Sequence, residues 1–217
     1  MSEGTGDGYG GRHPTSHERT NERPWDDSYR GEEPAPWDVG RPQPAVERLA
    51  GEGAFTGPVL DAGCGTGENA LRIAATGARV LGVDIAGTAL AMAREKARER
   101  GVDAEFALAD AFRLARLGRS FQTVLDCGLF HTFDDVERRE YVESLASVTA
   151  SGGRLHLLCF SDAEPGDWGP RRVTQEELRA SFDRTHGWEV LAIAPDRLVT
   201  SFDDEGVAAW LADVRRI

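Results

Sequence analysis

No stretch of the 217-residue sequence holds the roughly twenty consecutive apolar side chains that a membrane-spanning helix needs. The N-terminus also lacks the apolar stretch and the basic start of a secretory signal. These absences argue against membrane-embedded and exported proteins. We therefore expect a cytoplasmic protein with no membrane partner.

Cysteine is scarce, with only Cys64, Cys127 and Cys159 present. Their number is odd, and none of them stands in a Cys-x-x-Cys pair or beside histidines at metal-ligand spacing. The sequence therefore predicts neither a structural disulfide nor a metal site.

Basic charge is also in short supply. The 25 Lys and Arg residues stand against 37 Asp and Glu residues, which gives a formal net charge of −12, and the longest basic cluster is Arg171-Arg172. Affinity for nucleic acids comes largely from clustered cations. This balance argues against a DNA, rRNA or tRNA substrate.

The chain length and composition predict one folded domain with a short leader. A chain of 217 residues that is 40% hydrophobic has enough apolar side chains for one core. Residues 1–24 carry almost no large apolar side chain, so they are expected to form a disordered leader. Residues 25–217 are expected to form the catalytic domain, with 25–52 as an N-terminal lid segment.

After the leader, short apolar runs alternate with helical patterns. Strands are predicted at residues 57–61, 80–84, 104–108, 121–127, 154–160, 188–193 and 197–202. Helices are predicted at residues 42–49, 68–75, 87–100, 134–148, from Thr174 onward and at 208–214. This alternation predicts an α/β fold, a Rossmann-like doubly wound, mostly parallel seven-stranded sheet with helices on both faces. Ligands of such sheets bind at the carboxyl ends of the strands.

The first strand runs into a glycine-rich turn, residues 61–69, with the sequence DAGCGTGEN. Gly63, Gly65 and Gly67 allow the backbone to approach a ligand closely, and the helix that follows offers free amides at its N-terminus. The next strand ends in Asp84, at the distance expected of an acid that binds a ribose diol. The turn therefore predicts a nucleoside-containing ligand.

The spacing of this turn is Gly-x-Gly-x-Gly, whereas dinucleotide sites have Gly-x-Gly-x-x-Gly. The sequence VLDAGCGTG at 59–67 resembles the first motif of class I S-adenosylmethionine-dependent methyltransferases. An NAD(P)-linked oxidoreductase is the less favoured alternative, because a Tyr-x-x-x-Lys pair is also missing. A second alternative is a sensor that binds S-adenosylmethionine without turnover.

The resemblance implies S-adenosyl-L-methionine as cofactor and S-adenosyl-L-homocysteine as its product. In the family the glycine turn passes under the methionine moiety, the acid after the second strand binds the ribose, and residues after the second and third strands contact the adenine. The residues expected at the cofactor are Trp37, Asp61, Gly63, Cys64, Gly65, Gly67, Asp84, Ile85, Asp110, Ala111, Asp126 and Cys127. Cys127 is interpreted as a cofactor contact rather than a nucleophile.

Aromatic residues at 25–42 also carry a narrower resemblance. Trp25, Tyr29, Gly31, the run PWD at 36–38, Gly40 and Pro42 look like the N-terminal segment of thiopurine and tellurite methyltransferases and of actinobacterial enzymes that methylate heterocyclic toxins or quinones. This similarity implies a small-molecule acceptor. The aromatics either plug a groove on the core or form a lid over a ligand.

Methyl transfer is an in-line displacement that depends mainly on positioning, and it requires the acceptor to lose a proton. His131, just beyond the fourth predicted strand, is the candidate base, with a merely pocket-shaping histidine as the alternative. The loop 161–173 either binds substrate or is an exposed turn. The residues expected at the substrate are Tyr29, Phe130, His131, Phe160 and Trp168.

Together these features predict transfer of a methyl group from S-adenosylmethionine to an O, S or N atom of a small aromatic or heterocyclic molecule. The protein is expected to act as a monomer or a homodimer.

Overall fold

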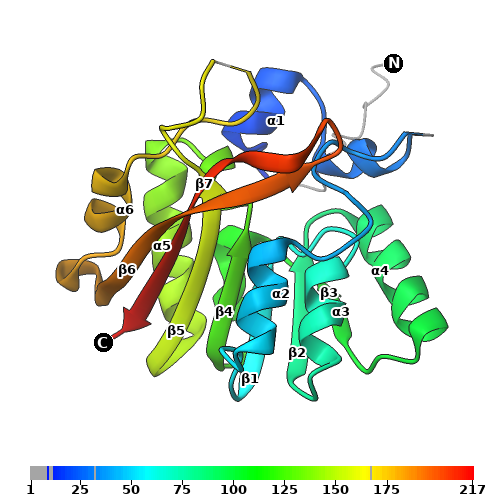
Figure 1. Cartoon of the computed structure of the whole chain (residues 1–217), viewed down its shortest axis with the longest axis horizontal. Coiled ribbons are helices and arrows are strands. Elements are labelled where there is room, and N and C mark those ends of the chain that lie inside the picture. Colours follow the sequence, from blue (N-terminus) through cyan, green and yellow to red (C-terminus); the bar gives the residue numbers. More distant parts are fainter. Residues whose placement is uncertain (1–8, 10–11, 32, 167) are drawn as a thin grey trace, which may run out of the picture.

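The computed structural model describes residues 9, 12–31, 33–166 and 168–217, and a seven-stranded sheet forms its centre (Figure 1). The strands are β1 (Pro58–Ala62), β2 (Arg79–Asp84), β3 (Glu105–Leu108), β4 (Phe121–Cys127), β5 (Thr149–Phe160), β6 (Trp188–Thr200) and β7 (Asp203–Arg216). Their order is β3-β2-β1-β4-β5-β7-β6. The first five pair in parallel and β7 runs antiparallel to both neighbours, which confirms the predicted mostly parallel α/β sheet.

Helices cover both faces of the sheet. The α-helices are α1 (Ser16–Asn21), α2 (Pro44–Gly51), α3 (Glu68–Ala74), α4 (Gly87–Arg100), α5 (Asp135–Val148) and α6 (Gln175–Ser181), and the 3-10 turns are η1 (Trp25–Tyr29), η2 (Ala111–Leu117), η3 (Phe130–Thr132) and η4 (Arg184–His186). In β1, Leu60 packs in a cluster with Leu145 of α5, whereas its neighbour Val59 packs in another with Ile73 of α3. Successive side chains of a strand point to opposite faces, so both faces of β1 are buried.

The strand order reverses at β1, which has β2 on one side and β4 on the other. The carboxyl ends of these three strands therefore meet at the switch point where α/β sheets bind their ligands. In Figure 1, α1 and the chain that follows it lie at the top of the view, over this end of the sheet. Among the described residues, no helix is both long and apolar enough to cross a bilayer.

The C-terminal helix predicted at 208–214 is wrong, because these residues belong to strand β7. The two strands predicted at 188–193 and 197–202 form one strand, β6. Ala209, Ala212 and Val214 are buried while β7 hydrogen-bonds to β5 on one side and β6 on the other. This ladder outweighs the local helix preference of an alanine-containing segment.

The leader prediction is wrong for residues 12–24, while residues 1–8, 10 and 11 lie outside the described residues. Helix α1 begins with a capping box between Thr15 and Glu18. The buried Glu18 carboxylate pairs with Arg12 and accepts hydrogen bonds from the backbone N–H of Thr15 (2.8 Å) and Trp25 (3.0 Å). Polar contacts, among them those of Ser16 and Arg19 with Glu137, thus hold a segment that has few apolar side chains.

Candidate active site

The glycine turn connects β1 to α3 in a conformation that side chains rarely adopt. Gly63, Gly65 and Gly67 have φ values of +73°, +52° and +85°. The backbone N–H groups of Gly63 and Cys64 donate to Val83 O at 2.8 and 2.9 Å, which fastens the turn to β2. The turn is therefore fixed before any ligand binds.

Two of these glycines should respond differently to alanine. A Cβ on Gly67 would lie 2.8 Å from Ala93 Cβ and 3.0 Å from the Phe106 ring, so Gly67→Ala is expected to destabilise the fold by about 2–3 kcal/mol. A Cβ on Gly65, which lines the cavity described below, would meet only Tyr29 Oη at 3.1 Å. Gly65→Ala is expected to cost about 1 kcal/mol of stability but at least about tenfold in cofactor affinity. Thermal denaturation measures the stability of the two variants, and calorimetric titration measures their affinity for the cofactor. Equal losses of affinity in Gly65→Ala and Gly67→Ala would contradict this prediction.

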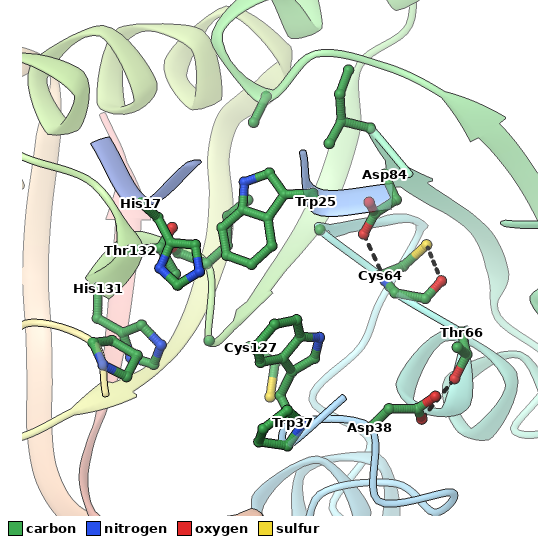
Figure 2. Close-up of a pocket in the computed structure, with 18 of the residues that line it drawn as sticks. His17, Trp25, Trp37, Asp38, Cys64, Thr66, Asp84, Cys127, His131 and Thr132 are labelled. Atoms are coloured by element: carbon green, nitrogen blue, oxygen red, sulfur yellow. Dashed lines mark hydrogen bonds between the residues drawn. The ribbon is translucent and has the colours of Figure 1, made fainter. Parts of the chain in front are cut away.

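Asp84 lies at the end of β2 and faces the glycine turn. Its carboxylate accepts hydrogen bonds from the backbone N–H of Gly65 at 2.8 Å (Figure 2) and from the backbone N–H of Ala86, also at 2.8 Å. Burial raises its pKa, against the opposing effect of these N–H donors. The carboxylate is thus held rigidly at the wall of a cavity, where its free lone pairs can accept hydrogen bonds from a diol.

A cavity of about 420 Å³ opens over the carboxyl ends of β1, β2 and β4, a size typical of small-molecule sites. Most of the predicted site residues line it: Tyr29, Trp37, Gly63, Cys64, Gly65, Asp84, Ile85, Asp110, Ala111, Cys127, His131, Phe160 and Trp168. Figure 2 shows two sides, with Asp84 and Cys64 on one and His17 and His131 on the other. Asp84 and Cys64, expected at the cofactor, thus lie across the cavity from His131, expected at the substrate, whereas His17 was not among the predicted residues.

Four predicted residues lie outside this cavity. Asp61, Gly67 and Asp126 are behind its wall, and Asp126 accepts hydrogen bonds from the backbone N–H of Leu129 (3.0 Å) and from Tyr141 Oη (2.9 Å). Phe130 is fully buried in the core cluster. The Asp126 carboxylate draws the chain after β4 inward, so Phe130 packs into the core rather than against a substrate.

Asp61 is a buried carboxyl whose Oδ2 has no hydrogen-bond partner among the described residues. Burial and, to a smaller extent, the negative charges of Asp84 and Asp126 together raise its pKa to about 7. The folded protein therefore keeps a proton at Asp61 at pH values where the unfolded chain, with a pKa of about 3.9, has lost it. The stability that this proton contributes is lost as the pH rises toward 7.

Raising the pH from 5 to 8 should therefore destabilise the ligand-free protein, by on the order of 2 kcal/mol through Asp61. Asp61→Asn removes this titration and should reduce the pH dependence by that amount. Chemical denaturation of both proteins at the two pH values measures the difference. An unchanged pH dependence in the variant would show that Asp61 is ionised throughout.

The N-terminal segment forms one wall of the cavity, which the sequence interpretation missed for residues before Trp25. The His17 ring stacks on Trp25 with centroids 4.2 Å apart and planes 7° apart, and Trp37 packs edge-on against Trp25 at 5.5 Å. Trp37 Nε1 donates to Tyr29 Oη at 2.8 Å. The capping-box spacing of Thr15 and Glu18 was the signal in the sequence that a helix begins here.

Polar contacts hold this wall against the sheet. Asp26 accepts from the backbone N–H (2.7 Å) and Oγ1 (2.9 Å) of Thr88 at the start of α4. Asp38 accepts from Thr66 Oγ1 at 2.8 Å within the glycine turn. The aromatic wall is thus attached to the glycine turn and to the start of α4.

The opposite side is aromatic and is closed by the loop 161–173. Phe160, at the end of β5, packs edge-on against His131 (4.7 Å) and Trp168 (5.9 Å). The Arg172 guanidinium lies over Phe160 at 5.3 Å and over Trp168 at 5.0 Å. It also donates to the carbonyl oxygens of Trp168 and Pro170, at 2.7 and 2.8 Å. Arg172 therefore folds the loop onto the aromatic side of the cavity.

His131 itself is buried, and its Nδ1 accepts a hydrogen bond from the backbone N–H of Phe160 at 2.9 Å. Burial lowers its pKa to about 3, and the positive charges of Arg138 and Arg172 act in the same direction. The imidazole is therefore neutral at physiological pH.

Comparison with known proteins identifies the class. A family model described as a methyltransferase domain matches residues 59–153, which include the glycine turn, Asp84 and β4. A curated relative, the 2-heptyl-1-hydroxyquinolin-4(1H)-one methyltransferase of Mycobacteroides abscessus, is 35% identical over 202 residues and covers 88% of both chains. The chain belongs to the S-adenosyl-L-methionine-dependent methyltransferases, and S-adenosyl-L-methionine is its cofactor.

Solved structures give the same assignment. A structure from work on the conversion of a disulfide bond into a thioacetal group during echinomycin biosynthesis is 37% identical, has a TM-score of 0.78, and covers 88% of this chain and 90% of its own. The magnesium protoporphyrin IX methyltransferase of Synechocystis with bound S-adenosylmethionine is 26% identical, has a TM-score of 0.61, and covers 79% of this chain and 76% of its own.

Proposed function

We propose that this methyltransferase transfers the methyl group of S-adenosylmethionine to a hydroxyl oxygen on a small, flat heterocycle. The observation that supports this most directly is a single cavity with the glycine turn and Asp84 on one side and the aromatic group of His131, Phe160 and Trp168 on the other. Such a cavity has room for a nucleoside cofactor beside a ring-shaped acceptor.

The residues present on the cofactor side are suited to S-adenosylmethionine. The absent side chain of Gly65 leaves room beside Tyr29 Oη, and Asp84 offers a fixed carboxylate to the ribose hydroxyls. Ile85 and Asp110 line the wall where we place the adenine. The bound cofactor supplies an electrophilic methyl group on a sulfonium sulfur.

The side chains of this protein contribute to the reaction mainly by positioning the two ligands and by excluding water. Holding the acceptor atom in line with the methyl group can supply about 7–11 kcal/mol of the barrier reduction. We propose that residues 25–52, together with helix α1, act as a lid that closes over both ligands through Trp25 and Trp37.

The acceptor class is proposed from the relatives and from the cavity wall. The Mycobacteroides relative is named as a methyltransferase of a hydroxylated quinolone, which is a flat bicyclic ring. Such a ring suits the wall formed by Phe160 and Trp168. A sulfur acceptor is the second candidate, supported by the 37% identical structure from echinomycin biosynthesis and by a probable thiol methyltransferase of Arabidopsis thaliana.

We further propose a cytoplasmic location and action as a monomer or homodimer on a small molecule rather than on nucleic acid. The reducing cytoplasm suits the free thiols of Cys64, Cys127 and Cys159 among the described residues. The net charge of −12 repels nucleic-acid phosphates.

An acceptor screen with isotope-labelled S-adenosylmethionine tests the proposal. We expect labelled product from 1-hydroxyquinolin-4-ones at a higher kcat/KM than from phenols, thiols or thiopurines. Preferential labelling of thiols would favour the sulfur candidate. Tight cofactor binding without product from any acceptor would instead indicate a cofactor-binding sensor.

A further inference from the structure

The hydrogen bond between Phe160 and His131 fixes which ring nitrogen carries the proton. A backbone N–H is always a donor, and that of Phe160 points at Nδ1 of His131 at 2.9 Å. Nδ1 must therefore present a lone pair. A neutral imidazole has one N–H group, so in His131 that group is at Nε2.

Nε2 faces the cavity. His131 lines the cavity, and its Cε1 and Nε2 atoms lie 3.8 Å from the Cβ position of Gly128, another lining residue. No described residue accepts a hydrogen bond from Nε2. A second polar group, the buried Thr200 hydroxyl, also lines the cavity and has no partner in the described part of the chain. A buried hydroxyl normally has a hydrogen-bond partner, and the described residues provide none for Thr200.

We propose that His131 binds the methyl acceptor as a hydrogen-bond donor, through Nε2–H, to a carbonyl or anionic oxygen of that molecule. The inference rests on the proposed function and deepens it. The site then selects rings with an oxygen acceptor next to, or conjugated with, the methylated atom. His131 is not the base, because Nε2 already carries a proton and Nδ1 is occupied.

The charges around His131 agree with this role. Arg138 from α5, Arg172 from the loop 161–173 and His17 from α1 all disfavour a second proton on the ring. Arg138 is offset by its ion pair with Glu177 at 3.3 Å, so Arg172 is the arginine that favours a negative charge on the bound molecule. A hydroxyl acceptor therefore binds as its anion: it loses its proton to water on entry, and its oxygen then forms the new bond to carbon as the carbon–sulfur bond breaks.

The tautomer can be measured without turnover. Nitrogen-15 NMR of the histidine rings in the S-adenosylhomocysteine complex, assigned with His131→Gln, is expected to show His131 protonated at Nε2 and not titrating between pH 5 and 8. Protonation at Nδ1, or titration near pH 6.5, overturns the proposal. This result does not depend on whether any acceptor is turned over.

The donor role can be tested with two acceptors of matched acidity, 1-hydroxyquinolin-4-one and a phenol without a carbonyl. Affinities for the S-adenosylhomocysteine complex are measured in the wild type, His131→Ala and His131→Gln. We expect His131→Ala to weaken quinolone binding by about 10–100-fold and phenol binding by less than about threefold, with partial rescue by the amide donor of His131→Gln. Equal losses for both acceptors, or no rescue by Gln, contradict a donor.

The pH profile separates a donor from a base. If His131 is a donor, kcat/KM rises with pH only because the methyl acceptor ionises. The pH at which kcat/KM rises then shifts when a methyl acceptor of different acidity is used, and it is the same in His131→Gln as in the wild type. A rise in kcat/KM at the same pH for every methyl acceptor, absent in His131→Gln, indicates that His131 is a base and overturns the proposal. If the NMR result holds but no acceptor is methylated, the proposed function fails and the tautomer assignment stands.

Discussion

Replacing Asp84 with alanine is expected to weaken S-adenosylmethionine binding by at least about 100-fold, equivalent to about 2.7 kcal/mol. The half-buried carboxylate lines the cavity and can accept two hydrogen bonds from ribose hydroxyls, each worth about 1.5–3 kcal/mol when the acceptor is charged. Its loss also frees the backbone N–H of Gly65, which it now holds at 2.8 Å. Calorimetric titration with S-adenosylmethionine and S-adenosylhomocysteine measures the effect on both ligands.

Asp103→Ala is the matched control, because Asp103 is exposed and lies outside the cavity. It should bind both ligands like the wild type. Thermal denaturation of the Asp84 variant must show a folded protein for the comparison to count. Affinity within about threefold of the wild type in folded Asp84→Ala would mean that the ribose lies elsewhere.

The Asp126→Ala variant should lose about 3–5 kcal/mol of folding free energy and melt roughly 10 °C or more below the wild type. Asp126 is completely buried and accepts hydrogen bonds from the backbone N–H groups of Leu129 and Phe130 and from Tyr141 Oη. Alanine leaves these three buried donors without their acceptor, each at a cost of about 1–3 kcal/mol.

Asp126→Asn is expected to stay within about 1 kcal/mol of the wild type at pH 8. Burial raises the pKa of Asp126 to about 6, so the site disfavours the charged carboxylate relative to water and accommodates a neutral amide at low cost. The Asn oxygen can replace the acceptor for Leu129 and Phe130. If both variants destabilise equally, the negative charge rather than the hydrogen-bond acceptor holds this turn.

The parallel half of the sheet and the cofactor side were predictable because their signals are local. The conformation of the glycine turn can be predicted from its residues, because Gly63, Gly65 and Gly67 occupy the left-handed region that other residues avoid. The position of Asp84 at the end of β2 could be predicted from the length of the apolar run that precedes it. In the structure, Gly63, Gly65 and Asp84 line one cavity.

The C-terminal strand was not predictable in the same way. Ala209 and Ala212 are compatible with a helix, and they form a strand because β5 and β6 provide partners on both sides. These contacts join residues far apart in the sequence, so no local pattern contains them.

The acceptor side was predictable in its residue types but not in its geometry. His131, Phe160 and Trp168 lie together, whereas Phe130 turns into the core because Asp126 binds its backbone. The N–H of Phe160 determines the tautomer of His131, and that bond spans 29 positions of the chain. The sequence left a base and a pocket-shaping histidine open for His131, and the hydrogen bond supports the proposed donor role.

The most direct test of the account is mass spectrometry of the products formed from trideuteromethyl S-adenosylmethionine and 1-hydroxyquinolin-4-one. We predict one trideuteromethyl group on the acceptor, attached to oxygen, with an equimolar amount of S-adenosylhomocysteine and no product with Asp84→Ala. An unchanged acceptor, incubated with folded wild-type protein that binds S-adenosylmethionine tightly, would contradict the proposed reaction.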